Sequence, residues 1–165
     1  MPGRTGSSLI GGRNRAHLGD DDVRRVTNTL LGLERSANFR HEADARTRFI
    51  VEESDEGQVG TIVFGADIYP GPGVADPNSA LSMQAAAAHE LAHLHRWRDR
   101  TELPFGPLDH LDEALTSLEA ALRYERTLSE HEVKQLIRDA VQRITLYVHQ
   151  QLGDGNVDED PAAGA

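Results

Sequence analysis

Two histidines and a glutamate stand at a spacing that can bind and use a metal ion, in the sequence HELAH at residues 89–93. If this segment is helical, His89 and His93 lie one above the other, because positions four apart differ by only about 40° around an α-helix. Both imidazoles can then bind one ion, and the neighbouring Glu90 can accept a proton from water that the ion activates. The H-E-x-x-H pattern therefore predicts a hydrolytic zinc site.

The motif is short, so its surroundings have to support it. A solvated helix with these residues at this spacing by chance is the simplest alternative. Four alanines at 85–88 precede the motif, and alanine is both a strong helix former and small enough to let another element approach closely. We therefore expect a packed helix from about Ala80 to Asp99. Glu90 and His93 also form the E-x-x-H motif of ferritin-like di-metal bundles, but a second E-x-x-H is missing.

A catalytic zinc ion usually has a third protein ligand, and two carboxylates are candidates. Asp99 would fit a metzincin pattern, but that pattern needs a glycine where this chain has Arg96, since only glycine enters the left-handed region cheaply. A helix that continues past Arg96 turns Asp99 about 240° away from His93. Glu113, on a separate predicted helix, is therefore the preferred third ligand.

With Glu113 as third ligand, the chain resembles the gluzincin superfamily of zinc metallopeptidases, in which H-E-x-x-H is followed by a glutamate on a second helix. The spacing is similar to that of the thermolysin group, and Asp-Glu-Ala at 112–114 resembles its Asn-Glu-Ala segment. In its small size the chain resembles the minimal ImmA/IrrE-type metallopeptidases. The resemblance covers about Phe49 to Tyr124. It departs from the pattern at Asp112, which replaces Asn, and in lacking the aromatic and Leu-Met-Pro signals of ImmA-like proteins.

This resemblance implies His89, His93 and Glu113 as ligands of a Zn²⁺ ion and Glu90 as the catalytic base. The expected reaction is hydrolysis of a peptide bond: zinc lowers the pKa of its bound water, and Glu90 takes the proton and returns it to the leaving amine. His110, one turn before Glu113, is a further catalytic candidate that could stabilise an oxyanion or orient a ligand. Other polar side chains on that face, Thr116 and Ser117 among them, are candidates to support the ligands.

Composition limits the class of protein. At 165 residues and 38% hydrophobic, the chain can bury one modest core. The formal charge of −10 disfavours nucleic acid as a partner, and the lack of cysteine excludes disulfides and thiolate metal sites. We find neither an apolar run long enough for a membrane span nor the apolar core of a signal peptide at the start, so we expect a cytoplasmic protein with no membrane partner.

The pattern of apolar residues predicts a small α+β zincin-like domain with a β-hairpin and about four helices, and with H-E-x-x-H on the central helix. We expect one such domain over 20–152, between a disordered basic arm at 1–19 and a disordered acidic tail at 153–165. The first helix should run from Asp20 to about Glu34, and the hairpin should join Arg48–Glu53 to Val59–Tyr69.

Two expectations concern the edges of this domain. The gluzincin resemblance implies that the strand from Gln58 to Phe64 borders a substrate cleft and offers a free edge with which an extended peptide could pair. Beyond the motif, a helix should start near Asp109, and a capping box at Ser129–Glu132 should open a last helix that is mainly core and ends at Gly153.

The protein class is open between two main readings. The first is a metalloendopeptidase that acts on a specific protein or peptide substrate. The second is a catalytically weak or inactive metal-binding module that works through contact with a regulatory protein partner. The ImmA/IrrE resemblance suggests a middle course, regulated cleavage of one partner such as a repressor, and a defence-associated toxin is a third possibility.

Overall fold

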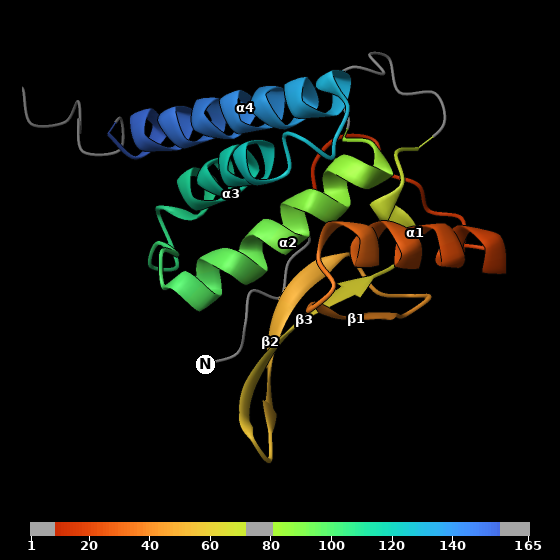
Figure 1. Ribbon diagram of the computed structural model, residues 1–165. Helices are drawn as coiled ribbons and strands as arrows, with labels where there is room; N and C mark the ends of the chain where they lie inside the picture. Colours follow the sequence, from red (N-terminus) through yellow and green to blue (C-terminus); the bar gives the residue numbers. More distant parts are fainter. Residues whose placement is uncertain (1–8, 72–80, 156–165) are drawn as a thin grey trace, which may run out of the picture.

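The computed structural model describes residues 9–71 and 81–155 of the chain, and its elements are four α-helices, three strands and one short 3-10 helix. In chain order they are α1 (Asp20–Leu33), β1 (Asn38–His41), β2 (Arg48–Ser54), β3 (Gly57–Phe64), η1 (Ala66–Ile68), α2 (Met83–Asp99), α3 (Asp109–Arg123) and α4 (Glu130–Gly155). This arrangement confirms the predicted α+β class (Figure 1). None of the helices in these ranges combines the length and the hydropathy that crossing a bilayer requires.

The three strands form one sheet in the order β1-β3-β2. β2 and β3 make the predicted antiparallel hairpin, with Phe49 opposite Ile62. The short β1, which the sequence pattern did not reveal, pairs with β3 in parallel and sets Phe39 beside the same Ile62. Because β3 lies in the centre of the sheet, the prediction that this strand offers a free edge to a peptide is wrong. The chain after β3 also leaves the sheet at η1 instead of continuing as a strand to Tyr69.

α2 is the central helix: it contacts the other three helices and the sheet, and it lies between the sheet and the pair formed by α3 and α4 (Figure 1). It begins after Ser82, whose Oγ accepts a hydrogen bond from the backbone N–H of Ala85 at 3.1 Å. The four alanines at 85–88 are fully buried, as expected for a helix approached from several sides. A Cβ at Gly60 would lie 2.8 Å from the Leu94 side chain, so this glycine allows α2 to pack directly onto β3.

The chain before α1 is ordered from residue 9 onward. Leu9 is buried in the core, and Asn14 donates its backbone N–H to the Tyr69 carbonyl at 3.0 Å. The Arg13 guanidinium donates to three backbone carbonyl oxygens, those of Asp67 at 2.8 Å, Ile68 at 2.8 Å and Leu81 at 2.7 Å. The prediction of a disordered arm over 1–19 is therefore wrong for 9–19, because one partly buried cation binds three backbone carbonyls there. Residues 1–8 lie outside the described part.

The predicted capping box of α4 is confirmed: Glu132 donates its backbone N–H to Ser129 Oγ at 3.2 Å, and the Ser129 N–H donates to the Glu132 carboxylate at 2.8 Å. Two other expectations for this helix are wrong. It continues through Gly153 to Gly155, and it is mainly core only where Leu136 and Ala140 face the rest of the domain. The remaining large apolar residues of α4 are mostly exposed. The tail after residue 155 lies outside the described residues.

Candidate metal centre

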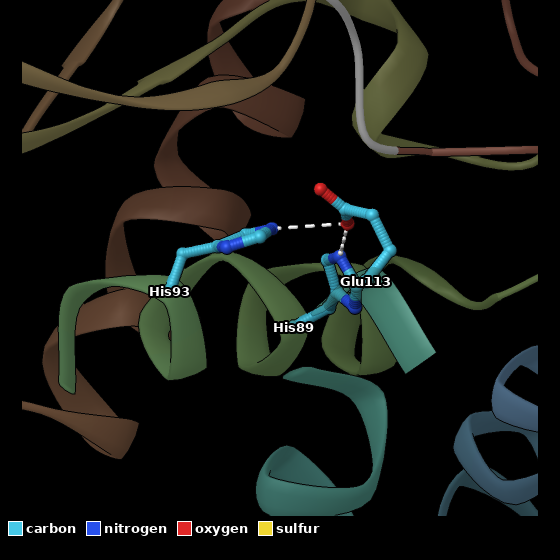
Figure 2. A group of neighbouring side chains, drawn as sticks. All are labelled: His89, His93 and Glu113. Atoms are coloured by element: carbon cyan, nitrogen blue, oxygen red, sulfur yellow. Dashed lines mark hydrogen bonds and ion pairs between the residues drawn. The ribbon is translucent and has the colours of Figure 1, made fainter. Parts of the chain in front are cut away.

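The structure brings the three predicted ligand side chains together from two helices. His89 and His93 on α2 point toward Glu113 on α3 (Figure 2). His89 Nε2 lies 3.0 Å from Glu113 Oε2, and His93 Nε2 lies 3.1 Å from the same oxygen. One donor atom from each side chain lies within 4.8 Å of the other two. All three residues are buried, with Glu113 the most exposed at 9%.

Glu113 is held in place through the residue before it. Asp112 Oδ1 accepts a hydrogen bond from the Arg96 guanidinium at 2.5 Å and another from the Leu103 backbone N–H at 2.8 Å. These bonds tie the first turn of α3 to the last turn of α2, which sets α3 beside the two histidines. Asp112, where the thermolysin-type pattern has Asn, is thus a structural residue that positions the third candidate ligand.

His89 is oriented by a chain of hydrogen bonds that reaches α4. Its Nδ1 lies 2.8 Å from Ser117 Oγ, and Ser117 donates its hydroxyl hydrogen to Asp139 Oδ2 at 2.5 Å. Arg143 donates from Nε to the same Asp139 oxygen at 2.7 Å. Ser117 was predicted to support the ligands, but Asp139 and Arg143 were not. A signal was available, because both charged residues lie on the helical face that also carries Leu136.

This chain of bonds fixes the tautomer of His89. Ser117 has one hydroxyl hydrogen, and that hydrogen goes to Asp139, so Ser117 Oγ must accept its bond from His89 Nδ1–H. In the neutral imidazole the other nitrogen, Nε2, then carries a lone pair, which faces the Glu113 carboxylate oxygen. Two lone pairs at 3.0 Å repel each other unless a proton or a metal cation lies between them.

Without a metal ion, protons on the two imidazoles can balance the charge of Glu113. Burial alone would raise the pKa of Glu113, but the charge of protonated His93 and hydrogen bonds from the two protonated rings outweigh it and hold the pKa well below its usual range. Arg143 adds a further cation, with its guanidinium 3.8 Å from Glu113 Oε2. The carboxylate is therefore ionised at neutral pH and is a ready acceptor for a cation.

Aromatic packing fixes the second histidine. The Phe49 ring of β2 is nearly parallel to the His93 imidazole, with an interplanar angle of 7° and centroids 6.4 Å apart. Trp97 packs against the same Phe49 ring, with the ring centroids 5.9 Å apart. Trp97 therefore has a packing role, and the hairpin closes one side of the site.

Glu90, the predicted base, is completely buried beside His89. Arg13 is close enough to Glu90 for their charges to interact. Burial lowers the pKa of Arg13 to about 10, and the negative charges of Asp67, Asp139 and Glu90 oppose that shift. The segment expected to be a floppy arm thus places a cation near the candidate base. No sequence signal marked Arg13, because it is one of several arginines in a segment rich in glycine and serine.

Two further candidates lie away from the cluster. His110 is half-buried one turn before Glu113, and among the described residues no hydrogen bond or ion pair joins it to the cluster, so its catalytic role stays a prediction. Asp99, the alternative third ligand, is exposed and 3.8 Å from Arg123. α2 continues through Arg96 and carries Asp99 away from the site, as the helical geometry required.

The donor set fits a zinc ion. Ligands at about 2.0–2.1 Å around a tetrahedral zinc stand roughly 3.3–3.4 Å apart, within a few tenths of an ångström of the 3.0 and 3.1 Å observed. Two imidazole nitrogens and one carboxylate oxygen are also the set that several zinc hydrolases use. Comparisons with protein-family models, curated proteins and solved structures found no match for this chain. The functional argument therefore depends on the site itself.

Proposed function

We propose that this protein is a zinc-dependent metallopeptidase that hydrolyses a peptide bond in a protein or peptide substrate. The observation that carries the proposal is the convergence of His89, His93 and Glu113, with the lone pair of His89 Nε2 turned toward the carboxylate. Such an arrangement is stable at neutral pH when a cation joins the three groups. The three donors come from two helices and leave room in a tetrahedral shell for one more ligand.

Each residue has a distinct part in the proposed reaction. When bound, zinc supplies Lewis-acid chemistry, since it polarises a carbonyl group and acidifies water in its open position. His89, His93 and Glu113 hold the ion, and Ser117 keeps the His89 ring in the required tautomer. Glu90 accepts the proton of the attacking water and delivers it to the leaving amine as the C–N bond breaks, which completes hydrolysis to a carboxylate and an amine.

A second candidate function is a metal-binding module without catalysis, in which the ion joins α2 to α3. The burial of the whole cluster favours it, because structural zinc sites are closed to solvent. The number of ligands favours a catalytic site instead: the part of the chain that the structure describes offers three donors in this cluster, whereas structural sites usually have four.

The two functions are separated by one pair of measurements. Metal content of the purified protein should be one zinc per chain, lost on treatment with a chelator and in a His93→Ala variant. Peptide hydrolysis should need zinc, and Glu90→Gln should keep the metal but lose about 10²–10⁴-fold in kcat/KM. If the wild type binds zinc but cleaves peptide libraries no faster than Glu90→Gln, and neither shows cleavage, the protein is the non-catalytic module.

A further inference from the structure

The outer side of α3 and α4 carries an exposed apolar face, which we call the leucine-rich face. On α3 it consists of four leucines, the exposed Leu115 and Leu122 and the half-buried Leu111 and Leu118. On α4 it consists of five residues, Ile137, Val141, Ile144, Val148 and Leu152. Leu122 is 77% exposed and Val141 58%. Most of the large apolar residues that the structure leaves exposed lie on these two helices.

The spacing within this face is that of a helix-packing seam. Successive residues are four, three and four positions apart on α3, and four, three, four and four apart on α4; alternation of three and four is the pattern of coiled-coil contacts. On α3 the leucines lie on the side opposite Glu113 and Ser117. On α4 the apolar stripe lies on the side opposite Asp139 and Arg143. Both stripes therefore point away from the metal centre. α3 and α4 lie side by side and are joined by only residues 124–129, so their stripes form one two-helix surface (Figure 1).

The face is large enough for a stable contact between proteins. α3 has 15 residues and α4 has 26, so the helices are about 22 and 39 Å long. With helices packed 8–10 Å apart, the two together present roughly 600 Å² of projected surface. Stable protein interfaces bury about 600–1,000 Å² on each partner, so the two helices reach the lower end of that range. Monomers rarely leave an apolar patch larger than a few hundred Å² in water.

The charge on this face favours a second copy of the chain. The protein has a formal charge of −10, so most parts of its surface repel another copy. From Val133 to Gly153, however, the sole acidic residue is Asp139, and it is buried against Arg143. Two copies can therefore bring their α4 helices together without bringing exposed carboxylates into contact.

We propose that the leucine-rich face is a homodimer interface, in which α3 and α4 of two copies pack as a four-helix bundle around a two-fold axis. A two-fold interface sets one surface against itself, and a stripe of apolar residues at seam spacing is self-complementary in this way. The inner sides of the same helices carry Glu113, Ser117 and Asp139, so the dimer would support one half of each metal centre from behind.

Sedimentation velocity of the full chain tests this interface. From about 1 to about 200 μM protein, a species of twice 18.1 kDa should grow with concentration, in the presence of chelator as well as of zinc. Val141→Glu combined with Val148→Glu should weaken the dimer at least tenfold, because each charge would be buried in the seam. Both valines are exposed in one copy, so circular dichroism and thermal unfolding should show an intact fold.

The matched control is Gln142→Glu combined with His149→Glu, which places two negative charges on α4 at exposed positions outside the stripe. These changes should leave the dimer in place. The proposal is overturned if the wild type stays at 18.1 kDa throughout the concentration range, or if both double variants dissociate equally. Binding of a monomeric wild type to phosphatidylserine vesicles would assign the face to a lipid surface and also overturn it.

Discussion

Two buried ionic clusters join α2 to α3, and they differ in how their charges are balanced. Near the end of α2, the Arg96 guanidinium faces the Asp112 carboxylate, one cation against one anion. One turn earlier on α2, His89 and His93 face Glu113, and the fixed tautomer of His89 turns a lone pair toward the carboxylate. In the first cluster the charges of the two protein side chains balance each other, whereas the second cluster needs protons or a metal ion to balance its carboxylate. Burial of charge therefore does not identify a metal site; the arrangement of donors does.

The largest effect should come from breaking the complete cluster. Asp112→Ala leaves the Arg96 cation buried without its carboxylate and should lower the free energy of unfolding by about 3–5 kcal/mol, in urea denaturation followed by circular dichroism with chelator present. Asp21→Ala, which removes the same kind of partner from the exposed Arg24, should cost less than about 1 kcal/mol. Equal losses in the two variants would contradict the assignment of Arg96–Asp112 as a structural pair.

A double replacement sharpens this first test. Arg96→Met combined with Asp112→Leu removes both charges and should recover much of the stability that Asp112→Ala loses, because no unpaired charge remains in the core.

The incomplete cluster should respond to zinc. At a free zinc concentration 100 times the dissociation constant, the wild type should gain about 2.7 kcal/mol in unfolding free energy, since the ion binds only the folded chain. His93→Ala should lose this gain, whereas Asp21→Ala, an exposed change on α1, should keep it. Urea denaturation with zinc and with chelator measures the difference. A zinc gain that survives in His93→Ala would show that the ion binds elsewhere.

The metal cluster was the more predictable of the two, because its residues follow local rules. Short stretches of sequence show the four-residue spacing of His89 and His93 and the helix signal at Asp109. The contacts between Arg96 and Asp112 or between Ser117 and Asp139 join residues 16 and 22 positions apart, and no local pattern selects those partners. The seam spacing of α4 indicated a helix with an apolar stripe, but periodicity cannot tell whether the rest of the chain covers that stripe.

The same limit explains the errors in the sheet and at the start of the chain. β1 is four residues long, Asn38–His41, and three of its four side chains are polar, so its sequence does not mark a strand. It exists because β3 offers it a parallel partner. Arg13 is ordered because the carbonyls after β3 accept its guanidinium, so its place depends on contacts with residues more than 50 positions away.

A smaller effect should follow from loosening the support of His89. Asp139→Asn or Ser117→Ala leaves all three candidate ligands present but removes the group that fixes the tautomer, and should weaken zinc binding about 10–100-fold. Competition with a chromophoric chelator measures the affinity. Thr145→Ala is the control on α4, since its hydroxyl bonds only to the Val141 carbonyl of its own helix. Unchanged affinity in both support variants would remove Ser117 and Asp139 from the centre.

The smallest effect concerns a histidine–carboxylate pair whose nitrogen–oxygen distance equals that in the metal cluster, but which has only two donor groups. His95, also on α2, lies 3.0 Å from Glu34 at the end of α1, and within the described residues no third donor joins them as a possible metal group. Burial would raise the pKa of Glu34, but hydrogen bonds from Ser36 and His95 outweigh it and lower the pKa below its ordinary value of 4.5. The pair should therefore contribute stability without binding zinc.

The sign of this contribution follows from the lowered pKa of Glu34. Since the carboxyl holds its proton less tightly in the folded than in the unfolded chain, the stabilisation is present above pH 4.5 and is lost as the pH falls through the lowered value. His95→Gln should reduce the unfolding free energy by less than about 1 kcal/mol near neutral pH, and the difference from wild type should shrink below pH 4.5. The zinc gain should be unchanged, because His95 lies outside the cluster of three donors. A His95→Gln variant that loses zinc would contradict the assignment of the metal centre to His89, His93 and Glu113 alone.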